Sequence, residues 1–267
     1  MLVVDAALEN AVHALALHEP ERLRDVLAAA AAPPLGGRGP AAVVDLPTND
    51  AEGDAGGAVR LHLRPLRHGG WLGGLLGRRW LGLARPVAEL EATAELRARG
   101  APVPRPVGVV GHRVWRFWEA VVATVFEEDA PDAARFLARD PAPARIHRAA
   151  RAAGHAVRRF HDAGGRHRDL HVGNLLVREV DERAEVIIVD LDRARLGPDP
   201  PPARRMAELM RLYRSLVKRG LATRVGPRGC AAFFAGYVGR DRDLRRALLA
   251  RLGRERVRVR LHALGYR

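Results

Sequence analysis

The chain has 267 residues, 48% of them hydrophobic, which is enough for one bilobal domain or two small domains with packed cores. This composition excludes an intrinsically disordered chain. The only cysteine, Cys230, excludes a disulfide framework or a cysteine-based zinc site and indicates a reducing compartment. The sequence has neither a membrane-spanning apolar run nor a signal-peptide pattern, so we expect a cytoplasmic protein, free or bound to a membrane surface.

The formal net charge is +14. Such a charge favours an anionic partner: nucleic acid, anionic lipid or a phosphorylated substrate. Lys218 is the single lysine and arginine is abundant, a bias typical of GC-rich genomes, which is a second explanation of the positive charge. Nucleic acid is not the partner we expect, because the sequence has no RNP-type aromatic motif, zinc finger or recognisable helix-turn-helix.

Hydrophobic periodicity and turn residues predict the secondary structure. In chain order, we expect one or two helices at 2–32, strands at 41–46 and 59–66, a helix at 86–99, strands at 107–110 and 114–126, and helices at 132–139, 145–163, 202–219 and 228–252. Residues 49–57, rich in Asp, Asn and Gly, predict a hairpin loop, and Gly111 predicts a turn between two strands. The chain therefore changes from strand-rich to helix-rich near Glu128.

The most informative segment is a loop of residues 167–174, here called the Asp–Asn loop, which carries Asp169 and Asn174 five positions apart. A short strand follows, and then a second apolar run, 186–189, that ends in Asp190. A hairpin of these two strands would bring Asn174 and Asp190 together. Their carboxylate and amide oxygens are hard ligands suited to Mg²⁺, and a nearby Asp169 could orient a hydroxyl and accept its proton.

This spacing matches the kinase pattern H-R-D-x-x-x-x-N followed by a metal-binding aspartate. The sequence therefore predicts an ATP- and Mg²⁺-dependent phosphotransferase with an α+β, bilobal, protein-kinase-like fold. We expect a helical extension at 1–34, a small lobe with an antiparallel sheet and one helix at 35–127, and a mainly helical lobe at 128–267. A chance Asp–Asn loop beside a polar strand end is the structural alternative.

Other parts of a nucleotide site should lie in the strand-rich half. The candidates are Gly36, Gly37 and Gly39 over the phosphates, Arg64 on a strand as the phosphate-binding cation, Glu89 on the following helix as its partner, and Glu127 in the acidic turn. Lysine is usual at the cation position, and arginine has a different reach. The alternatives are an ordinary glycine turn, a solvated strand arginine, and competition for Glu89 from the glutamates at 91 and 95.

Two histidines flank the catalytic aspartate. His171 is a candidate for contact with the γ-phosphate or for ordering the loop, and His167 is expected to hold the loop by hydrogen bonds. Protein kinases usually carry lysine two residues after the catalytic aspartate, whereas small-molecule kinases often read D-L-H-x-G-N, as here. No A-P-E element follows Asp192, and the connection to the next helix is short, which argues against a protein substrate.

At these residues the chain resembles the lipopolysaccharide core kinase family, and especially the 3-deoxy-D-manno-octulosonic acid (Kdo) kinases. The resemblance spans roughly residues 35–218, and it includes 63–70, 95–106, 169–174 and 189–196. Arg64 agrees with the Kdo-kinase pattern. Val172 stands where the family usually has proline, and Leu191 where it usually has phenylalanine. Residues 1–32 match no pattern of the family.

The resemblance implies phosphorylation of the 4-hydroxyl of Kdo attached to lipid A, at the cytoplasmic face of the inner membrane. The acceptor would then be an anionic glycolipid, and an anionic membrane surface would attract the basic protein. The tryptophan-containing segment 71–80 could dip into that surface, although an ordinary linker is the simpler interpretation. Open alternatives are another small-molecule or protein kinase, or a nucleotide-binding pseudokinase. The sequence does not indicate a protein partner.

Overall fold

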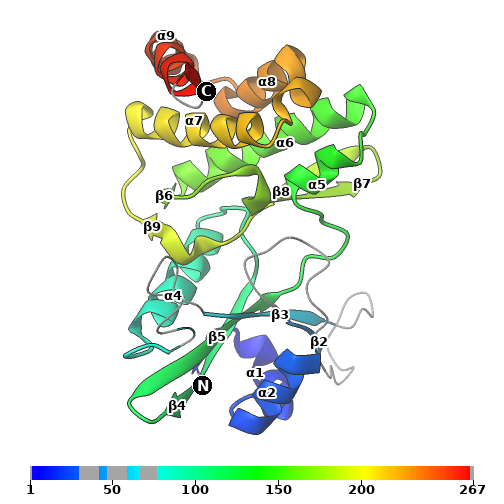
Figure 1. The fold of residues 1–267 in the computed structure, drawn as a ribbon, viewed down its shortest axis with the longest axis vertical. Helices are drawn as coiled ribbons and strands as arrows, with labels where there is room; N and C mark the ends of the chain where they lie inside the picture. Colours follow the sequence, from blue (N-terminus) through cyan, green and yellow to red (C-terminus); the bar gives the residue numbers. More distant parts are fainter. Residues whose placement is uncertain (1, 30–41, 47–58, 67–76, 78, 265–267) are drawn as a thin grey trace. The chain divides into compact units, whose positions relative to one another are not determined.

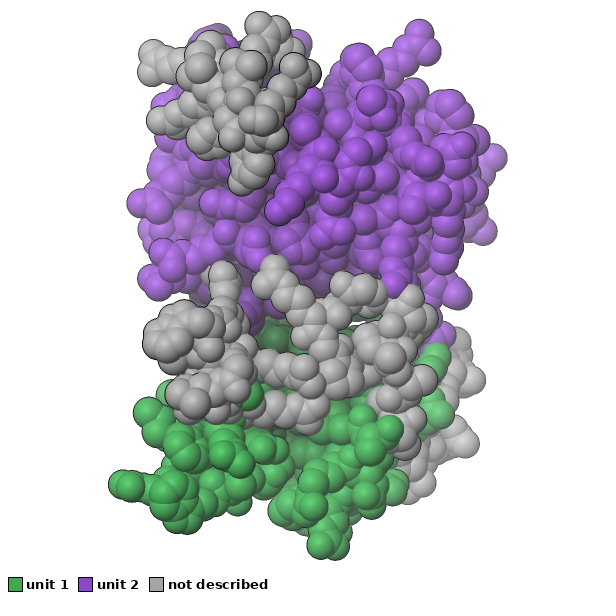
Figure 2. All heavy atoms as spheres, viewed as in Figure 1, with its two compact units in different colours: residues 1–95, 104–127 green, residues 96–103, 128–267 purple. Residues whose placement is uncertain are grey.

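The computed structural model describes residues 2–29, 42–46, 59–66, 77 and 79–264, and Figure 1 shows its helices and strands. Contacts between residues group the chain into two compact units, coloured in Figure 2: residues 1–95 with 104–127, and residues 96–103 with 128–267. The expected α+β class is confirmed, because helices and antiparallel sheets occur throughout the described residues. The bilobal kinase-like arrangement stays a prediction.

The first unit contains one antiparallel five-stranded sheet in the order β1-β4-β5-β3-β2. Its elements are β1 (Leu2–Val3), the 3₁₀ helix η1 (Ala6–Leu8), α1 (Glu9–Ala14), α2 (Pro20–Ala29), β2 (Ala42–Asp45), β3 (Arg60–Pro65), most of α4 (Ala84–Ala98), β4 (Pro106–Val114) and β5 (Phe117–Val125). Alternation along β3 buries Leu61 and Leu63 completely. They share a core with Val12 and Leu23 of the N-terminal helices, so α1 and α2 cover part of this sheet.

Residues 2–29 differ from the expected all-helical extension because their first residues form a strand. Leu2 pairs with Val109 of β4 in an antiparallel ladder. Just beyond the strand, Asp5 accepts a hydrogen bond from Arg105 Nη2 at 2.8 Å within an ion pair. A strand of two residues carries too little periodicity to be recognised in a sequence, and the ladder with β4 holds it in place.

The turn predicted at Gly111 is wrong. Gly111 pairs with Ala120 inside the β4–β5 ladder, and the chain reverses at Trp115 and Arg116 instead. Trp115 has φ +57°, in the left-handed region. Glycine is needed at 111 for another reason: a Cβ there would lie 2.7 Å from a methyl carbon of Leu83. The glycine therefore allows close packing and does not mark a reversal of the chain.

The second unit is mainly helical, and Figure 1 shows its helices with the strands of two small two-stranded sheets. Its elements are α5 (Ala133–Ala138), α6 (Pro143–Asp162), β6 (Gly165–His167), η2 (Val172–Asn174), β7 (Leu175–Val180), β8 (Arg183–Ile188), η3 (Leu191–Arg193), β9 (Ala194–Leu196), α7 (Pro202–Lys218), α8 (Ala222–Val238) and α9 (Arg242–Leu264). β6 pairs with β9, β7 pairs with β8, and α8 packs along α6.

The single helix expected at 228–252 is two helices, α8 and α9. Gly239, with φ +51°, ends α8 in a conformation that favours glycine. Asp241 then begins α9, since its Oδ1 accepts a hydrogen bond from the backbone N–H of Leu244 at 2.9 Å. Residues 239–243 carry no apolar side chain, so this polar interval and the two capping residues were the sequence signals of the break.

Residues 96–103 belong to the second unit although they lie within the strand-rich half of the sequence. Leu96, Ala101 and Val103 are buried in the core of that unit. The backbone N–H of Ile188, at the end of β8, donates to the carbonyl of Pro102 at 2.8 Å. The segment therefore adds an outer backbone contact to the β7–β8 hairpin.

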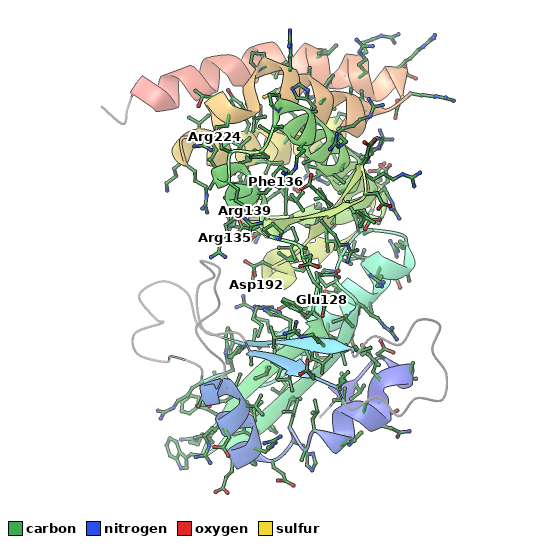
Figure 3. The ribbon with its side chains drawn as sticks, turned by 90° about the vertical axis from the view of Figure 1, so that its right-hand side faces the viewer. Glu128, Arg135, Phe136, Arg139, Asp192 and Arg224 are labelled. Atoms are coloured by element: carbon green, nitrogen blue, oxygen red, sulfur yellow. The ribbon has the colours of Figure 1, made fainter. Side chains whose placement is uncertain are left out.

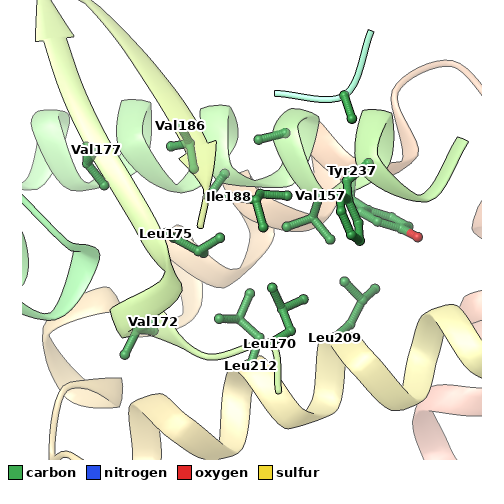
Figure 4. Close-up of a cluster of buried hydrophobic side chains, with 14 of the residues drawn as sticks. Val157, Leu170, Val172, Leu175, Val177, Val186, Ile188, Leu209, Leu212 and Tyr237 are labelled. Carbon is green, nitrogen blue, oxygen red and sulfur yellow. The ribbon is translucent and has the colours of Figure 1, made fainter. Parts of the chain in front are cut away.

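The core of the second unit anchors the Asp–Asn loop. Figure 4 shows Leu170 between Leu212 of α7 and the end of β8, with Val172 beside the start of β7. Leu170 is completely buried and Val172 nearly so. Burial of two such side chains contributes several kcal/mol, at about 1.5–3 kcal/mol each, so the loop is held by packing as well as by hydrogen bonds.

Helix α5 is fixed to α8 by one arginine. Arg224 donates from Nη1 to the carbonyl of Leu137 at 2.9 Å and to Oδ1 of Asp140 at 3.1 Å. Figure 3 labels Arg224 together with Phe136 of α5 and Arg139, the C-cap of that helix. The contact gives a second donor to the Leu137 carbonyl, which also accepts from the backbone N–H of Asp140 at 3.2 Å at the end of α5.

Two glycine substitutions should change stability in opposite directions. A Cβ on Gly154 of α6 would lie 2.1 Å from the carbonyl oxygen of Phe233 in α8, whereas the space around Gly253 of α9 is open. We expect Gly154→Ala to destabilise the protein by at least about 2 kcal/mol through forced separation of α6 and α8. Gly253→Ala should stabilise it by up to about 1 kcal/mol through helix propensity. Urea unfolding measures both, and equal effects would contradict the close packing.

Candidate active site

The β7–β8 hairpin brings together the residues on either side of it. Leu175 opposes Ile188 in the ladder, so Asn174 directly precedes the hairpin and Asp190 follows two residues after its end. The backbone N–H of Val189 donates to the carbonyl of Asn174 at 3.0 Å and extends the ladder by one bond. Asn174 and Asp190 therefore lie at the same end of the hairpin, as the sequence pattern predicts.

His167 holds the Asp–Asn loop against the strand end, which confirms the structural role expected for it. The ring is completely buried. Its Nδ1 accepts a hydrogen bond from the backbone N–H of Asp169 at 3.2 Å, and its Nε2 lies 3.2 Å from the carbonyl of Val189. An N–H donor on one side and a carbonyl on the other assign the tautomer that carries its proton on Nε2.

A buried polar network fixes His167 to the helices behind it. Oε2 of Glu208 in α7 accepts from the backbone N–H of His167 at 2.9 Å and lies 3.2 Å from Nε2 of His161. On its other side, His161 Nδ1 lies 2.7 Å from the hydroxyl of Tyr237. That hydroxyl also accepts from Arg205 Nη1 at 3.4 Å. Burial raises the pKa of Tyr237, so its hydroxyl keeps the proton that it donates to His161.

Two further side chains of α7 bind the Asp–Asn loop. Arg211 Nη1 donates to the carbonyl of His167 at 3.3 Å, and Ser215 Oγ accepts from the backbone N–H of Val172 at 3.1 Å. Sequence reasoning did not identify Glu208, Arg211 or Ser215. The signal was available, because spacings of three and four residues place all three on one face of a helix.

His171 is half-buried and makes a hydrogen bond that orders the loop. Its Nδ1 accepts from the backbone N–H of Gly173 at 3.1 Å, which leaves Nε2 as the protonated nitrogen of the neutral ring. Burial lowers the pKa of His171, Asp169 and Asp190 raise it, and Arg219 and His167 lower it further, for a net decrease. Asn174 is hydrogen-bonded to the backbones of Asp169 and Val189, so Asp169, His171, Asn174 and Asp190 all belong to the loop and strand end that these bonds join.

The donor set at Asn174 and Asp190 fits a hard cation. Asn174 is nearly buried, and its Nδ2 donates to the carbonyl of Asp169 at 3.0 Å, which leaves Oδ1 as its acceptor atom. Asp190 adopts φ +61° at the start of η3, and its carboxylate makes no cap to that helix. The described residues contain no group of three or more His, Cys, Asp or Glu that could form a protein-only cage. One carboxylate and one amide oxygen suit Mg²⁺, which keeps several waters.

In the first unit, the expected pair of Arg64 and Glu89 is present. Arg64 Nη2 of β3 forms an ion pair with Oε1 of Glu89 in α4, and the glutamate is the more buried partner. Thr93 Oγ1 donates to the Glu89 carbonyl at 2.7 Å, one turn further along α4. Of the three candidate glutamates, the one at 89 is therefore the partner of Arg64.

Four other candidates complete the placement of the predicted site residues. Gly36, Gly37 and Gly39 lie outside the described residues, as does most of the tryptophan-containing segment. Glu127 is half-buried and follows β5 by two residues, next to Phe126, whose N–H donates to the carbonyl of Arg60 at 2.7 Å. A nucleotide role for these four residues stays a prediction.

A hollow of about 120 Å³ lies elsewhere in the second unit, beside α5 and β7. Phe136 and Arg139, labelled in Figure 3, line it together with Arg145 and Glu179, which form a bidentate ion pair. None of the predicted site residues lines it. Its size and internal ion pair make it a poor candidate for a substrate site.

Comparison with known proteins identifies the family. The model of the lipopolysaccharide kinase (Kdo/WaaP) family matches residues 58–237, a range that contains the Asp–Asn loop, the hairpin and α7. The chain therefore belongs to this family. Two curated relatives from Vibrio vulnificus, strains YJ016 and CMCP6, are both named 3-deoxy-D-manno-octulosonic acid kinase. Each is 28% identical, over 161 and 160 residues, and each match covers 58% of this chain and 64% of the relative, just under two thirds.

The Glu208 network should be essential for stability. Glu208→Ala would leave the His167 N–H and a His161 nitrogen without their acceptor in a dry interior, at about 1–3 kcal/mol for each unsatisfied group. We expect a loss of about 3 kcal/mol in urea unfolding, together with faster hydrogen exchange at the His167 amide. Glu185→Ala, which removes the exposed ion pair of Glu185 with Arg178, is the matched control and should cost less than about 1 kcal/mol. Equal losses would contradict the network.

His62 should make the protein less stable in mild acid. This residue lies on β3 two positions from Arg64, and burial, followed by the charge of Arg64, lowers its pKa from 6.5 to about 4. Between these values the unfolded chain binds a proton that the folded chain does not bind. The stabilisation is therefore complete above pH 6.5 and is lost as the pH falls towards 4, by about 3 kcal/mol.

The measurement is the melting temperature between pH 7.5 and 4.5. The decrease should be clearly smaller in His62→Gln than in the wild type. The control His13→Gln, which removes an exposed histidine of α1, should follow the wild-type curve. A wild-type slope in His62→Gln would show that His62 is not the group that titrates.

Proposed function

We propose that this protein is an ATP-dependent kinase that transfers the γ-phosphoryl group to a sugar hydroxyl of the lipopolysaccharide inner core. The observation that carries the proposal is the convergence of Asp169, His171, Asn174 and Asp190 at one end of the β7–β8 hairpin. Family membership and the names of the two relatives support the same reaction class.

In this proposal Asp169 is the group that receives the proton of the acceptor hydroxyl. Its backbone is held on both sides, because its N–H donates to His167 and its carbonyl accepts from Asn174. The acceptor oxygen forms a bond to the γ-phosphorus, the bond from that phosphorus to the bridging oxygen breaks, and ADP leaves with the electron pair. A fixed carboxylate favours this step chiefly by orienting the hydroxyl.

Asn174 Oδ1 and the Asp190 carboxylate would hold Mg²⁺. When bound, the ion neutralises phosphate charge in the reaction. The hydrogen bond from Asn174 Nδ2 to the Asp169 carbonyl orients the amide of Asn174. The backbone bond from Val189 to Asn174 fixes the chain next to Asp190. His171, with its proton on Nε2, would donate a hydrogen bond to a phosphate oxygen.

In this proposal Arg64 binds the nucleotide phosphates and Glu89 orients the side chain of Arg64, as the resemblance implies. Glu89 is nearly buried, and its ion pair holds the guanidinium of Arg64 in one direction. Arginine binds phosphate through a planar fork and stays charged at all physiological pH values. Gly36, Gly37, Gly39 and Glu127 complete the proposed nucleotide site.

The proposed acceptor is Kdo linked to lipid A, phosphorylated at its 4-hydroxyl at the cytoplasmic face of the inner membrane. The choice of Kdo as the sugar rests on the names of the relatives. The net charge of +14 suits an anionic glycolipid and an anionic membrane surface. No helix in the described part of the chain combines the length and apolar character that crossing a membrane requires.

Asp169→Asn should abolish phosphoryl transfer while nucleotide binding persists. The reason is that the amide cannot accept the hydroxyl proton, although the loop keeps its backbone bonds. We expect a fall in kcat of at least about 10³-fold, measured with Mg-ATP and Kdo-bearing lipid A precursor, with ATP affinity within about twofold. Asp190→Asn should instead weaken Mg²⁺-dependent ATP binding. Asp181→Asn, in the β7–β8 turn, is the matched control.

Three outcomes would redirect the proposal. Normal turnover in Asp169→Asn would refute the role of Asp169. Turnover by the wild type on a different acceptor in a screen for ADP release would move the protein to another small-molecule or protein kinase. Nucleotide binding with no turnover on any acceptor would make it a pseudokinase.

A further inference from the structure

One face of α7 carries a line of polar side chains directed at the Asp–Asn loop. Glu208, Arg211, Ser215 and Arg219 follow one another at steps of three, four and four residues, so they project from the same side of the helix. The first three bind backbone atoms of the loop. Arg219, at the C-terminal end of the helix, is the fourth member of this line.

Arg219 reaches the loop but forms no bond to it. Its Nη2 lies 3.6 Å from the position that a Cβ of Gly173 would occupy, and its charge acts on the ring of His171. Within the described part of the chain, no carboxylate pairs with Arg219, and its guanidinium makes no hydrogen bond. The residue is exposed, so this guanidinium is available to a ligand at the loop.

The electrostatics of the loop define which ligand this cation suits. Asp169 and Asp190 both place negative charge beside His171. An acceptor that carries its own anionic group would be repelled by them unless a cation compensates. Arg219 supplies that cation, and its planar fork matches the two oxygens of a carboxylate.

We propose that Arg219 binds the carboxylate of a sugar-acid acceptor and so directs the neighbouring hydroxyl to Asp169. This inference rests on the proposed function and adds to it the group by which the acceptor is recognised. It also explains why the line on α7 continues past the three residues that hold the loop. A basic residue at a helix C-terminus can serve the helix dipole alone, and Lys218, in the last turn of the same helix, tests that alternative.

The experiment compares wild type, Arg219→Gln, Arg219→Lys and Lys218→Gln on Kdo-bearing lipid A precursor and on the same acceptor with its carboxyl groups methylated. We expect Arg219→Gln to raise the acceptor KM at least about tenfold with the KM for ATP unchanged, and Arg219→Lys to recover part of the loss. Lys218→Gln should behave as the wild type. The acceptor KM of the wild type should rise on the methyl ester by as much as the KM of Arg219→Gln rises on the acid. The KM of Arg219→Gln should be the same for the acid and the ester.

Two results would overturn the inference. If Arg219→Gln matched Lys218→Gln, the side chain would serve only the helix end. If Arg219→Gln weakened the acid and the ester equally, the anion that it binds would be a lipid phosphate and not the carboxylate.

Binding of the free sugar acid, followed by NMR titration, separates this inference from the proposed function. Wild-type binding that is lost in Arg219→Gln would support the role of Arg219 even if no phosphoryl transfer occurred, in which case the proposed function alone would fail. If the wild type did not bind the free sugar acid and its KM were the same for the acid and the ester, the inference would be wrong. Phosphoryl transfer could still be measured in that case.

Discussion

The hydrogen bond from the His167 backbone to the Glu208 carboxylate is the interaction on which the candidate site depends. A buried carboxylate is costly unless donors surround it, and here a backbone N–H and a histidine ring meet it in the interior of the second unit. The bond joins α7 to the start of the Asp–Asn loop. The His167 ring then contacts the Val189 carbonyl, so the position of Asp190 follows from the same anchor.

Helix α7 serves the site along its length. Its buried apolar side packs Leu209 and Leu212 against the core, while its polar line holds the loop at Glu208 and Ser215 and ends at Arg219. A helix repeats its side-chain directions every three to four residues, so one rigid element can both support a loop and present a charge beside it. The same helix therefore holds the loop and sets the position of Arg219 beside it.

The elements that could be predicted from sequence were those with strong local signals. Long periodic helices, the alternating strand β3 and the hairpin after Asn174 are indicated by patterns among neighbouring residues. The secondary-structure predictions were wrong where one residue type has more than one structural role. Gly111 resembles a turn residue but gives room to Leu83, and Gly239 ends one helix inside a region for which we expected a single helix. The two-residue strand β1 exists because β4 offers a partner.

The spacing of Asp169, Asn174 and Asp190 determined the chemistry to expect. Asp169 and Asn174 lie five residues apart, and a hairpin joins Asn174 to Asp190. Carboxylate and amide oxygens in this arrangement suit a metal-bound phosphate. The choice of Glu89 as the partner of Arg64, the buried network around Glu208 and the approach of Arg219 to Gly173 were decided by tertiary structure. Each depends on contacts between residues at least 25 positions apart in the chain, and no local pattern specifies which of several candidate side chains will meet.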